Sequence, residues 1–263
     1  MLVVMASLIL VDLTKKFGDV IAVDSLNLFI PHGEFFVVVG PSGCGKTTLL
    51  KLIAGLLKPD GGRIYIDGVL VNDLPPVRRG VNMVFQSYAL FPHMKVFDEK
   101  KYSNLSFALK LRKYVTPKIK KIVENVSEQV GIERSLYPRK PGELSAGQQQ
   151  KVAVGRSILI PPKILLMDEP LSNLDPQSRI KVSDEIRKLH KELETTTVYV
   201  THNLVEAMAL ADRMAVMNRG GIEQVDTPEN IYSHPANEFV ADFIKYFDFG
   251  YQMAKRRMQE LTS

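Results

Sequence analysis

The sequence predicts an α/β fold, and three observations carry the prediction. Short runs rich in Val, Ile and Leu alternate along the chain with helical stretches, which is the pattern of a layered α/β architecture. The five apolar residues Phe35 to Val39 have the composition of a strand buried on both faces. A Gly-rich turn follows that run at once, and a helical pattern follows the turn.

The length, the apolar runs and the net charge of the chain limit which kinds of protein it can be. At 263 residues, the chain is long enough for one large α/β domain or for a core with a subsidiary lobe. No apolar run approaches the roughly 18 to 20 residues of a membrane helix, and the first residues lack the basic region and cleavage site of a secretory signal. We expect Met1 to Val11 to be a leader of a few residues followed by an edge strand. The net charge of +5 suits a protein that handles polyanions or lies near an anionic membrane, and it suits an ordinary solvated surface equally.

The elements after the first buried strand are predicted from local periodicity. Lys46 to Leu57 repeats apolar residues at helical spacing, and one face of that helix would carry Leu49, Leu50, Ile53, Leu56 and Leu57. A turn at Lys58 to Gly62 leads into the alternating strand Arg63 to Asp67. The apolar run Val81 to Phe85 predicts a further strand.

From about Ser87 to Lys140 the sequence is charged and helical, with no strong strand pattern. This change predicts a helical lobe inserted into the core, which we place at about residues 87–160. Strands return at Ile164 to Met167, Thr197 to Val200 and Met214 to Met217. The chain shows no internal repeat and no heptad run long enough for a coiled coil.

The Gly-rich turn fits the phosphate-binding pattern G-x-x-x-x-G-K-[ST]. Its residues are Gly40, Pro41, Ser42, Gly43, Cys44, Gly45, Lys46, Thr47 and, next in the helix, Thr48. Glycines let backbone N–H groups approach phosphate oxygens where a Cβ would block them, and the helix that begins there directs its positive dipole end at the same anion. Lys46 adds a charge for the β and γ phosphates, and the Thr47 hydroxyl is a ligand for Mg²⁺. The sequence therefore predicts an ATP-binding loop, in which Cys44 is a small loop residue rather than a nucleophile.

A second strand end supplies the acidic residues that such a loop requires. The apolar residues Ile164 to Met167 predict a buried strand, with Asp168 at its carboxyl end and Glu169 next. Asp168 would bind Mg²⁺ directly or through water, and Glu169 would polarise an attacking water as general base. Taken alone, an apolar run that ends in Asp-Glu is a common strand terminus, so this prediction depends on the loop.

A third motif makes the sequence similar to the ATP-binding subunits of ABC transporters, over about residues 6–245. In that family a Leu-Ser-Gly-Gly-Gln motif precedes the acidic strand, and here that place holds Leu144-Ser145-Ala146-Gly147-Gln148-Gln149-Gln150. The resemblance implies that Ser145, Gly147 and Gln148 form an anion site at a helix N-terminus, facing the γ-phosphate of ATP held by a partner subunit. Two nucleotides would then lie between two subunits in a head-to-tail dimer. Without the other motifs, the segment reads as a Ser-capped helix with a nearby Gly.

Four more residues match positions of that family. Gln86 resembles the glutamine that contacts the metal and the attacking water, and His202 resembles the switch histidine at the γ-phosphate. Asp175, in the segment Ser172-Asn173-Leu174-Asp175, resembles part of the loop that crosses the dimer interface. Phe17 resembles the aromatic residue that stacks on adenine, whereas an isolated Phe is more often part of a core. The other four histidines have no partner at metal-ligand spacing, so we expect no zinc or iron site ligated by the protein.

The resemblance also implies the rest of the fold: a P-loop NTPase core with a RecA-like mixed sheet and helices on both faces, an N-terminal antiparallel β subdomain and the inserted helical subdomain. Residues 1–245 would form the ATP-binding domain. Residues 246–263 would form a tail with a short basic helix at Met253 to Leu261, without the regulatory β-barrel domain of maltose-type subunits. Stretches such as Val84 to His93 are similar to importer ATPases for carbohydrates, and polyamine, iron and anion importers share much the same residues.

Several positions depart from the family's pattern. Ala146 replaces a glycine and adds a methyl group where backbone must approach phosphate, which predicts weaker closure or slower hydrolysis. Asn203 stands where an aspartate commonly follows the switch histidine. Lys100 to Ser103 resembles an insertion in the lobe that meets the membrane subunits, and Lys140 to Gly142 lengthens the approach to Leu144.

The sequence favours a transporter motor that closes as a dimer on ATP and reopens after hydrolysis, with ATP and Mg²⁺ as cofactors. The resemblance implies uptake of a small solute, foremost a sugar. It also implies that the chain is a peripheral protein at the cytoplasmic face of the cell membrane. Its partners would be a second ATP-binding subunit, membrane permease subunits and, indirectly, an extracellular solute-binding protein, but no nucleic acid. Two alternatives stay open. One is a non-transport ATPase of DNA repair or translation, although such relatives usually carry a long coiled coil or two ATPase copies. The other is a nucleotide-binding regulator with weak hydrolysis.

Overall fold

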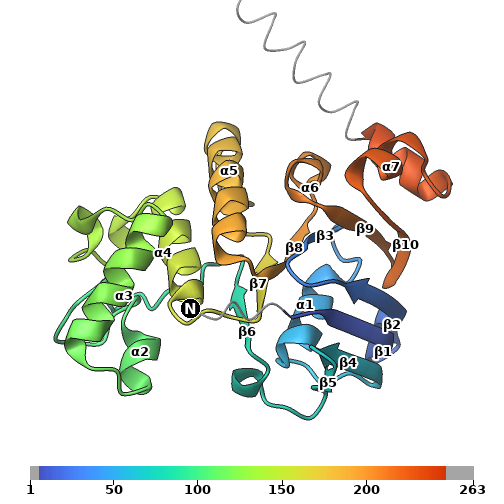
Figure 1. Ribbon diagram of the computed structural model, residues 1–263. Helices are drawn as coiled ribbons and strands as arrows, with labels where there is room; N and C mark the ends of the chain where they lie inside the picture. Colours follow the sequence, from blue (N-terminus) through green and yellow to red (C-terminus); the bar gives the residue numbers. More distant parts are fainter. Residues whose placement is uncertain (1–5, 247–263) are drawn as a thin grey trace, which may run out of the picture. The chain divides into compact units, whose positions relative to one another are not determined.

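The computed structural model describes residues 6–246, and these residues form two compact units (Figure 1). The first unit is made mainly of Leu74–Thr197, with the short segment Pro31–Gly33. The second unit contains Leu8–Ile30, Glu34–Asp73 and the chain from Val198 onward. The leader proposed at the start of the chain and the basic helix proposed at Met253 to Leu261 lie outside the described residues.

An antiparallel sheet opens the second unit, as the resemblance implied. Its strands are β1 (Leu8–Phe17), β2 (Val20–Ile30), β4 (Gly61–Ile66) and β5 (Val69–Leu70), in the order β2-β1-β4-β5. The prediction that the first strand lies at an edge is wrong, because β1 pairs with β2 on one side and with β4 on the other. The alternation of buried residues along β1 reports which face is covered, and it carries no information on the number of neighbouring strands.

A second set of strands carries the predicted phosphate loop. In the second unit, β3 (Phe35–Val39) is buried at all five residues and pairs in parallel with β9 (Arg213–Asn218). An antiparallel hairpin joins β9 to β10 (Gly221–Asp226). Strand β8 (Thr196–Thr201) crosses from the first unit to the second along the chain, and the helices α6 (Leu204–Leu210) and α7 (Pro228–Ser233) follow.

Helix α1 follows the loop and is shorter than the sequence predicted. It spans Lys46–Ala54 rather than reaching Leu57. The helix ends because Gly55 takes a left-handed conformation, with φ 78°, and its N–H bonds back to the carbonyl of Leu52. Leu56 is consequently 48% exposed instead of lying on the buried face, where Leu52 lies.

The first unit combines two parallel strands with helices. Strand β6 (Val81–Val84) pairs in parallel with β7 (Ile164–Asp168). The helices are α2 (Phe107–Leu111), α3 (Thr116–Gln129), α4 (Ala146–Ile158) and α5 (Pro176–Leu193), and α3 packs against α4 (Figure 1). The boundaries of a helical subdomain at residues 87–160 stay a prediction.

The segment at residues 87–106 contains no helix, contrary to the expectation of helical sequence from Ser87 onward. In this segment, hydrogen bonds from the side chain of Asn104 take the place of the backbone hydrogen bonds of a helix. Its Oδ1 accepts from the N–H of Phe91, and its amide donates to the carbonyls of Met94 and Lys95. Asn104 is fully buried, so this loop is organised around one polar side chain that local periodicity does not reveal.

None of the helices within residues 6–246 is both long and apolar enough to cross a membrane.

Candidate functional site

The backbone of the predicted phosphate loop forms an anion-binding geometry. The loop joins β3 to α1, and its glycines Gly43 and Gly45 have φ values of 81° and 109°. Gly45 is the N-cap of α1. As at the start of any α-helix, the N–H groups of the first turn have no acceptor within the helix, and the helix dipole makes this end positive. The loop therefore presents backbone donors to an anion.

Packing against the chain itself explains two of the loop's glycines. A Cβ on Gly40 would lie 2.1 Å from the carbonyl oxygen of Met217, and a Cβ on Gly45 would lie 2.0 Å from that of Ala22. A Cβ on Gly43 would meet nothing within 4 Å. The approach of phosphate was expected to require all these glycines. The structure adds that β2 and β9 already exclude any larger residue at two of the positions.

Lys46 is folded into the loop. Its side chain is buried, the residue being 4% exposed, and its ammonium donates to the carbonyls of Gly40 and Pro41, both at 2.8 Å. Burial raises the pKa of the neighbouring Cys44 thiol, so this thiol stays protonated near neutral pH. A protonated thiol is a weak nucleophile, and the role of Cys44 as a small loop residue stays a prediction.

The turn between β9 and β10 supports the loop, which the sequence reasoning missed. The N–H of Gly220 donates to the carbonyl of Cys44, and the carbonyl of Gly220 accepts from Asp24, both at 2.9 Å. Gly220 has φ 86° and follows Arg219, with φ 43°, so the two residues form a tight hairpin turn. The Arg-Gly-Gly sequence was a local signal for a turn, but it does not reveal that the turn contacts Cys44, which is far away in the chain.

Phe17 and His202 lie in the same unit as the loop. Phe17 ends β1, is 48% exposed, and has the Lys15 ammonium 5.5 Å from its ring centroid. Phe17 is part of the hairpin of β1 and β2, and the carbonyl of Ala22 in β2 lies next to Gly45 of the loop. The hairpin that carries Phe17 therefore borders the loop. His202 follows β8, and the next residue, Asn203, caps α6 by accepting from the N–H of Val205 at 2.9 Å.

A buried carboxylate fixes the segment that carries His202. Glu206 on α6 accepts hydrogen bonds from the hydroxyls of Tyr199 and Thr201, at 3.0 and 2.8 Å. Thr201 in turn accepts from the N–H of Asn203. Sequence reasoning did not single out Glu206, because nothing in its immediate sequence distinguishes it from a solvated helix residue.

The acidic residues lie in the first unit, at the end of β7. Asp168 is its last residue and is buried. Glu169 has φ 44°, a left-handed conformation that costs free energy for a residue with a side chain. The N–H and hydroxyl of Ser172 both donate to the carbonyl of Glu169, at 3.2 and 2.9 Å. These bonds stabilise the turn that sets the direction of the Glu169 side chain.

The structure brings Gln86 together with the predicted interface loop. Gln86 is exposed just after β6, and its carbonyl accepts from the side-chain amide of Asn173 at 3.1 Å. Arg156 on α4 donates to the carbonyls of Tyr88 and Ala89, which follow Gln86 and both have positive φ. The Gln86 turn is therefore held on both sides by side chains of the same unit.

Asp175 has a local role in the same loop. It caps α5 by accepting from the N–H groups of Gln177 and Ser178, at 3.1 and 3.0 Å. Hydrogen bonds from Ser178, the side chain first and then the backbone, hold the pKa of the Asp175 carboxyl below its usual range.

Ser145 starts α4, as the sequence predicted. It is the N-cap, and its hydroxyl accepts from the N–H of Gln148 at 3.3 Å while the Gln148 side chain accepts from the N–H of Ser145 at 3.0 Å. This reciprocal pair leaves the first-turn N–H groups of Ala146 and Gly147 without an intrahelical acceptor. A Cβ on Gly147 would meet only Leu174, at 4.0 Å. The start of α4 is thus a second positive helix end with an uncrowded glycine.

Within residues 6–246, no group of three or more His, Cys, Asp or Glu side chains is arranged to hold a metal ion.

Comparison with known proteins identifies the family. A sequence model of the family described as ABC transporter matches residues 23–172. The trehalose/maltose import ATP-binding protein MalK of Thermococcus litoralis is 51% identical over 246 residues, covering 91% of this chain and 64% of the relative. The spermidine/putrescine import ATP-binding protein PotA of Nitrosomonas europaea is 51% identical over 240 residues, covering 91% and 65%. The chain thus spans slightly less than two thirds of the length of these two curated relatives.

A solved structure supports the same assignment. A dimeric ATP-binding cassette in a post-hydrolysis state, bound to ADP and Pi, superposes with a TM-score of 0.73 at 31% identity. The match covers 84% of this chain and 98% of that one. The predicted P-loop NTPase fold and the predicted resemblance to importer ATP-binding subunits are confirmed. The chain therefore belongs to the ABC transporter family.

Proposed function

We propose that the chain is an ATP-hydrolysing motor subunit of an ABC transporter, which drives uptake of a small solute through separate membrane subunits. The observation that carries the proposal is the loop at Gly40 to Thr48, whose glycine conformations and position at the start of α1 suit the binding of an anion such as phosphate. In this proposal the backbone of the loop holds the β and γ phosphates of ATP. Lys46 turns its ammonium from the carbonyls of Gly40 and Pro41 to the phosphate oxygens. Phe17 stacks on the adenine.

The proposal assigns the remaining residues to metal binding and proton transfer. Thr47, Gln86 and Asp168 offer oxygen atoms, which are the ligands that Mg²⁺ prefers, so the donor set fits this ion. When bound, Mg²⁺ neutralises charge on the phosphates. Glu169 accepts the proton of the attacking water, and His202 stabilises the γ-phosphate by a hydrogen bond.

A second copy of the chain completes each site in this proposal. The start of α4, with Ser145, Gly147 and Gln148, carries a positive helix end and exposes its cap to solvent. We assign it to the γ-phosphate of ATP held by the partner subunit, with Asp175 in the loop between the subunits. The dimeric state of the solved relative supports this arrangement.

An apolar groove in the first unit is our candidate for the contact with a membrane permease. It has a volume of about 590 Å³ and is lined by residues of β6, α2, α4 and the Gln86 turn, among them Phe85, Phe91, Phe107 and Leu111. A helix of the permease with apolar side chains fits such a groove. This contact would hold the chain at the cytoplasmic face of the membrane, with a solute-binding protein engaged only through the permease.

The solute is proposed from the names of the relatives and from the motif stretches. The matched relatives are import proteins for sugars and for polyamines at equal identity. The stretch Val84 to His93 resembles carbohydrate importers, although other importers share much of it, and a sugar is our first candidate. The test is to purify the full chain with the membrane subunits that bind it, and to measure Mg²⁺-dependent ATP hydrolysis and ATP-driven sugar uptake in vesicles. A purified complex that takes up no solute and hydrolyses no ATP would refute the proposal.

Replacing Ala146 with Gly is expected to raise the rate of ATP hydrolysis at saturating ATP by a few fold. Ala146 is the first residue of α4, where a methyl group adds bulk beside the N–H groups that would approach the partner's phosphate. The measurement is steady-state turnover of purified wild type and variant. Ala153→Gly, in the interior of the same helix, controls for the general cost of glycine in a helix. Equal turnover of wild type and Ala146→Gly would contradict the prediction.

Replacing Asn173 with Ala is expected to lower turnover by about three- to tenfold and to raise the Mg²⁺ concentration needed for half-maximal activity. The substitution removes the hydrogen bond that holds the carbonyl of Gln86, and a looser turn positions the glutamine less well. The Mg²⁺ titration distinguishes this from a general loss of stability. Asn125→Ala, at an exposed asparagine of α3, is the control. An unchanged Mg²⁺ dependence in Asn173→Ala would show that the tie to Gln86 has no role.

A further inference from the structure

The positive charge of the chain is concentrated in residues 95–121, which we call the basic segment. It contains nine Lys and Arg residues and two acidic residues, a net charge of +7. The whole chain has a net charge of +5, so the remaining residues together carry −2. The net positive charge that the sequence left unexplained is therefore carried by one segment of the first unit.

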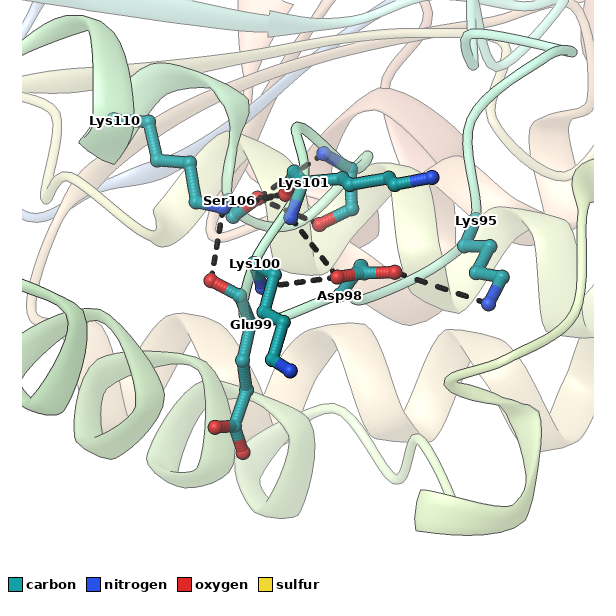
Figure 2. A network of polar contacts seen from close by, with 8 residues as sticks. Lys95, Asp98, Glu99, Lys100, Lys101, Ser106 and Lys110 are labelled. Carbon is teal, nitrogen blue, oxygen red and sulfur yellow. Dashed lines mark hydrogen bonds and ion pairs between the residues drawn. The ribbon is translucent and has the colours of Figure 1, made fainter.

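A turn around Asp98 fixes the first lysines of this segment (Figure 2). The Asp98 carboxylate accepts from the N–H groups of Lys100 and Lys101, both at 2.9 Å. The ammonium of Lys110 on α2 donates to the carbonyls of Glu99 and Lys101. These hydrogen bonds hold the backbone of Lys100 to Ser103, and the side chains of Lys100 and Lys101 run in different directions from it (Figure 2).

Most cations of the basic segment are exposed and uncompensated. Within the described residues, Lys100, Lys101, Lys113 and Lys121 are exposed and lie in no ion pair, whereas Lys120 pairs with Glu99 at 2.7 Å. Apolar side chains stand among them. Tyr102, Leu111 and Val115 are 50%, 59% and 66% exposed. A surface that mixes exposed lysines with aromatic and aliphatic side chains has the composition of a peripheral membrane contact.

The basic segment is continuous with the apolar groove assigned above to a permease. Phe107, Leu111 and Arg112 of the segment line that groove, and the Tyr102 ring lies 5.6 Å from the ring of Phe107. An element that contacts a permease lies close to the plane of the membrane, where anionic lipid headgroups are the nearest polyanion. We propose that the basic segment is a docking surface for anionic phospholipid headgroups, an inference that rests on the proposed transporter function.

The proposal gives a direct binding test on the full chain. The probes are vesicles of phosphatidylcholine alone and vesicles containing phosphatidylglycerol, assayed by flotation at low and high salt. We expect binding to the anionic vesicles only, and weakening with salt because the interaction is screened. Each Lys near an anionic surface raises the binding constant roughly fivefold. Reversing Lys100, Lys101 and Lys113 to Glu is therefore expected to weaken binding by at least about a hundredfold.

A matched control variant distinguishes binding through the basic segment from an effect of the protein's overall net charge. Lys181→Glu, Lys188→Glu and Lys191→Glu change three exposed lysines of α5 and alter the net charge equally. We expect this triple variant to bind anionic vesicles almost as well as wild type. Equal binding to neutral vesicles, no binding to anionic vesicles, or equal losses in the two triple variants would each overturn the proposal.

ATP hydrolysis measured on the same preparations separates the two proposals. A chain that hydrolyses ATP but does not bind anionic vesicles refutes the lipid contact alone. A chain that binds these vesicles through the three lysines but never hydrolyses ATP refutes the motor function instead.

Discussion

Glu169→Gln is expected to lower steady-state ATP hydrolysis by at least about 100-fold while ATP binding is retained. An amide has the size of the carboxylate but cannot accept the proton of the attacking water, and general-base catalysis contributes about 10²- to 10⁴-fold. The hydrogen bonds from Ser172 to the Glu169 carbonyl involve only the backbone of residue 169, so the substitution leaves the turn in place. Turnover and nucleotide binding are measured on the same purified protein.

Glu194→Gln is the matched control for this experiment. Glu194 also has a left-handed backbone, with φ 50°, and is exposed at the end of α5 in the same unit. The two substitutions therefore make the same chemical change in the same backbone conformation, and only Glu169 follows the buried strand β7. We expect Glu194→Gln to keep wild-type turnover. Turnover in Glu169→Gln within twofold of wild type would remove this residue from the chemistry and would favour the nucleotide-binding regulator.

The parts of the fold that the sequence predicted well depend on contiguous residues. The strand at Phe35 to Val39 was predicted with its observed bounds, because five apolar residues in a row specify a strand buried on both faces. The strand at Ile164 was predicted for the same reason, and the structure extends it by one residue to Asp168. The phosphate loop is likewise a local motif whose spacing determines its conformation.

The wrong predictions concern features that distant residues decide. The first strand lies inside its sheet because β4, some fifty residues later, pairs with it. Residues 87–106 are a loop because the buried side chain of Asn104 satisfies backbone groups that a helix would have paired. Helix α1 is the exception, since Gly55 was a local stop signal that the apolar pattern of Leu56 and Leu57 obscured.

The candidate site likewise has features that local motifs predict and features that depend on distant residues. Its proposed reactive residues follow from motifs, whereas the contacts that hold them in place could not be predicted from the sequence. Glu206 fixes the segment of His202 through two hydroxyls, and Asn173 fixes the carbonyl of Gln86. Such supporting contacts join residues that do not belong to one motif, and only the folded chain brings them together.

Gly45→Ala is expected to abolish nucleotide binding and to lower the free energy of unfolding by about 3 kcal/mol or more. Two costs add at this position. A Cβ would lie 2.0 Å from the carbonyl oxygen of Ala22, which is backbone and cannot rotate aside, and the φ of 109° is itself unfavourable for alanine. Relief requires the loop to move away from β2, which misaligns the first-turn N–H groups of α1. Urea unfolding and binding of a fluorescent ATP analogue measure the two effects.

Gly43→Ala distinguishes packing from backbone strain. Gly43 also has a positive φ, 81°, but a Cβ there would meet nothing within 4 Å of the chain. We expect this variant to lose only about 1–2 kcal/mol, the usual cost of a left-handed alanine. Its nucleotide affinity then reports whether phosphate needs the space that the missing side chain leaves. If Gly43→Ala and Gly45→Ala destabilise the protein equally, the contact with Ala22 is not what requires glycine at position 45. If Gly43→Ala stays folded but no longer binds ATP, the space beside Gly43 is needed by the nucleotide.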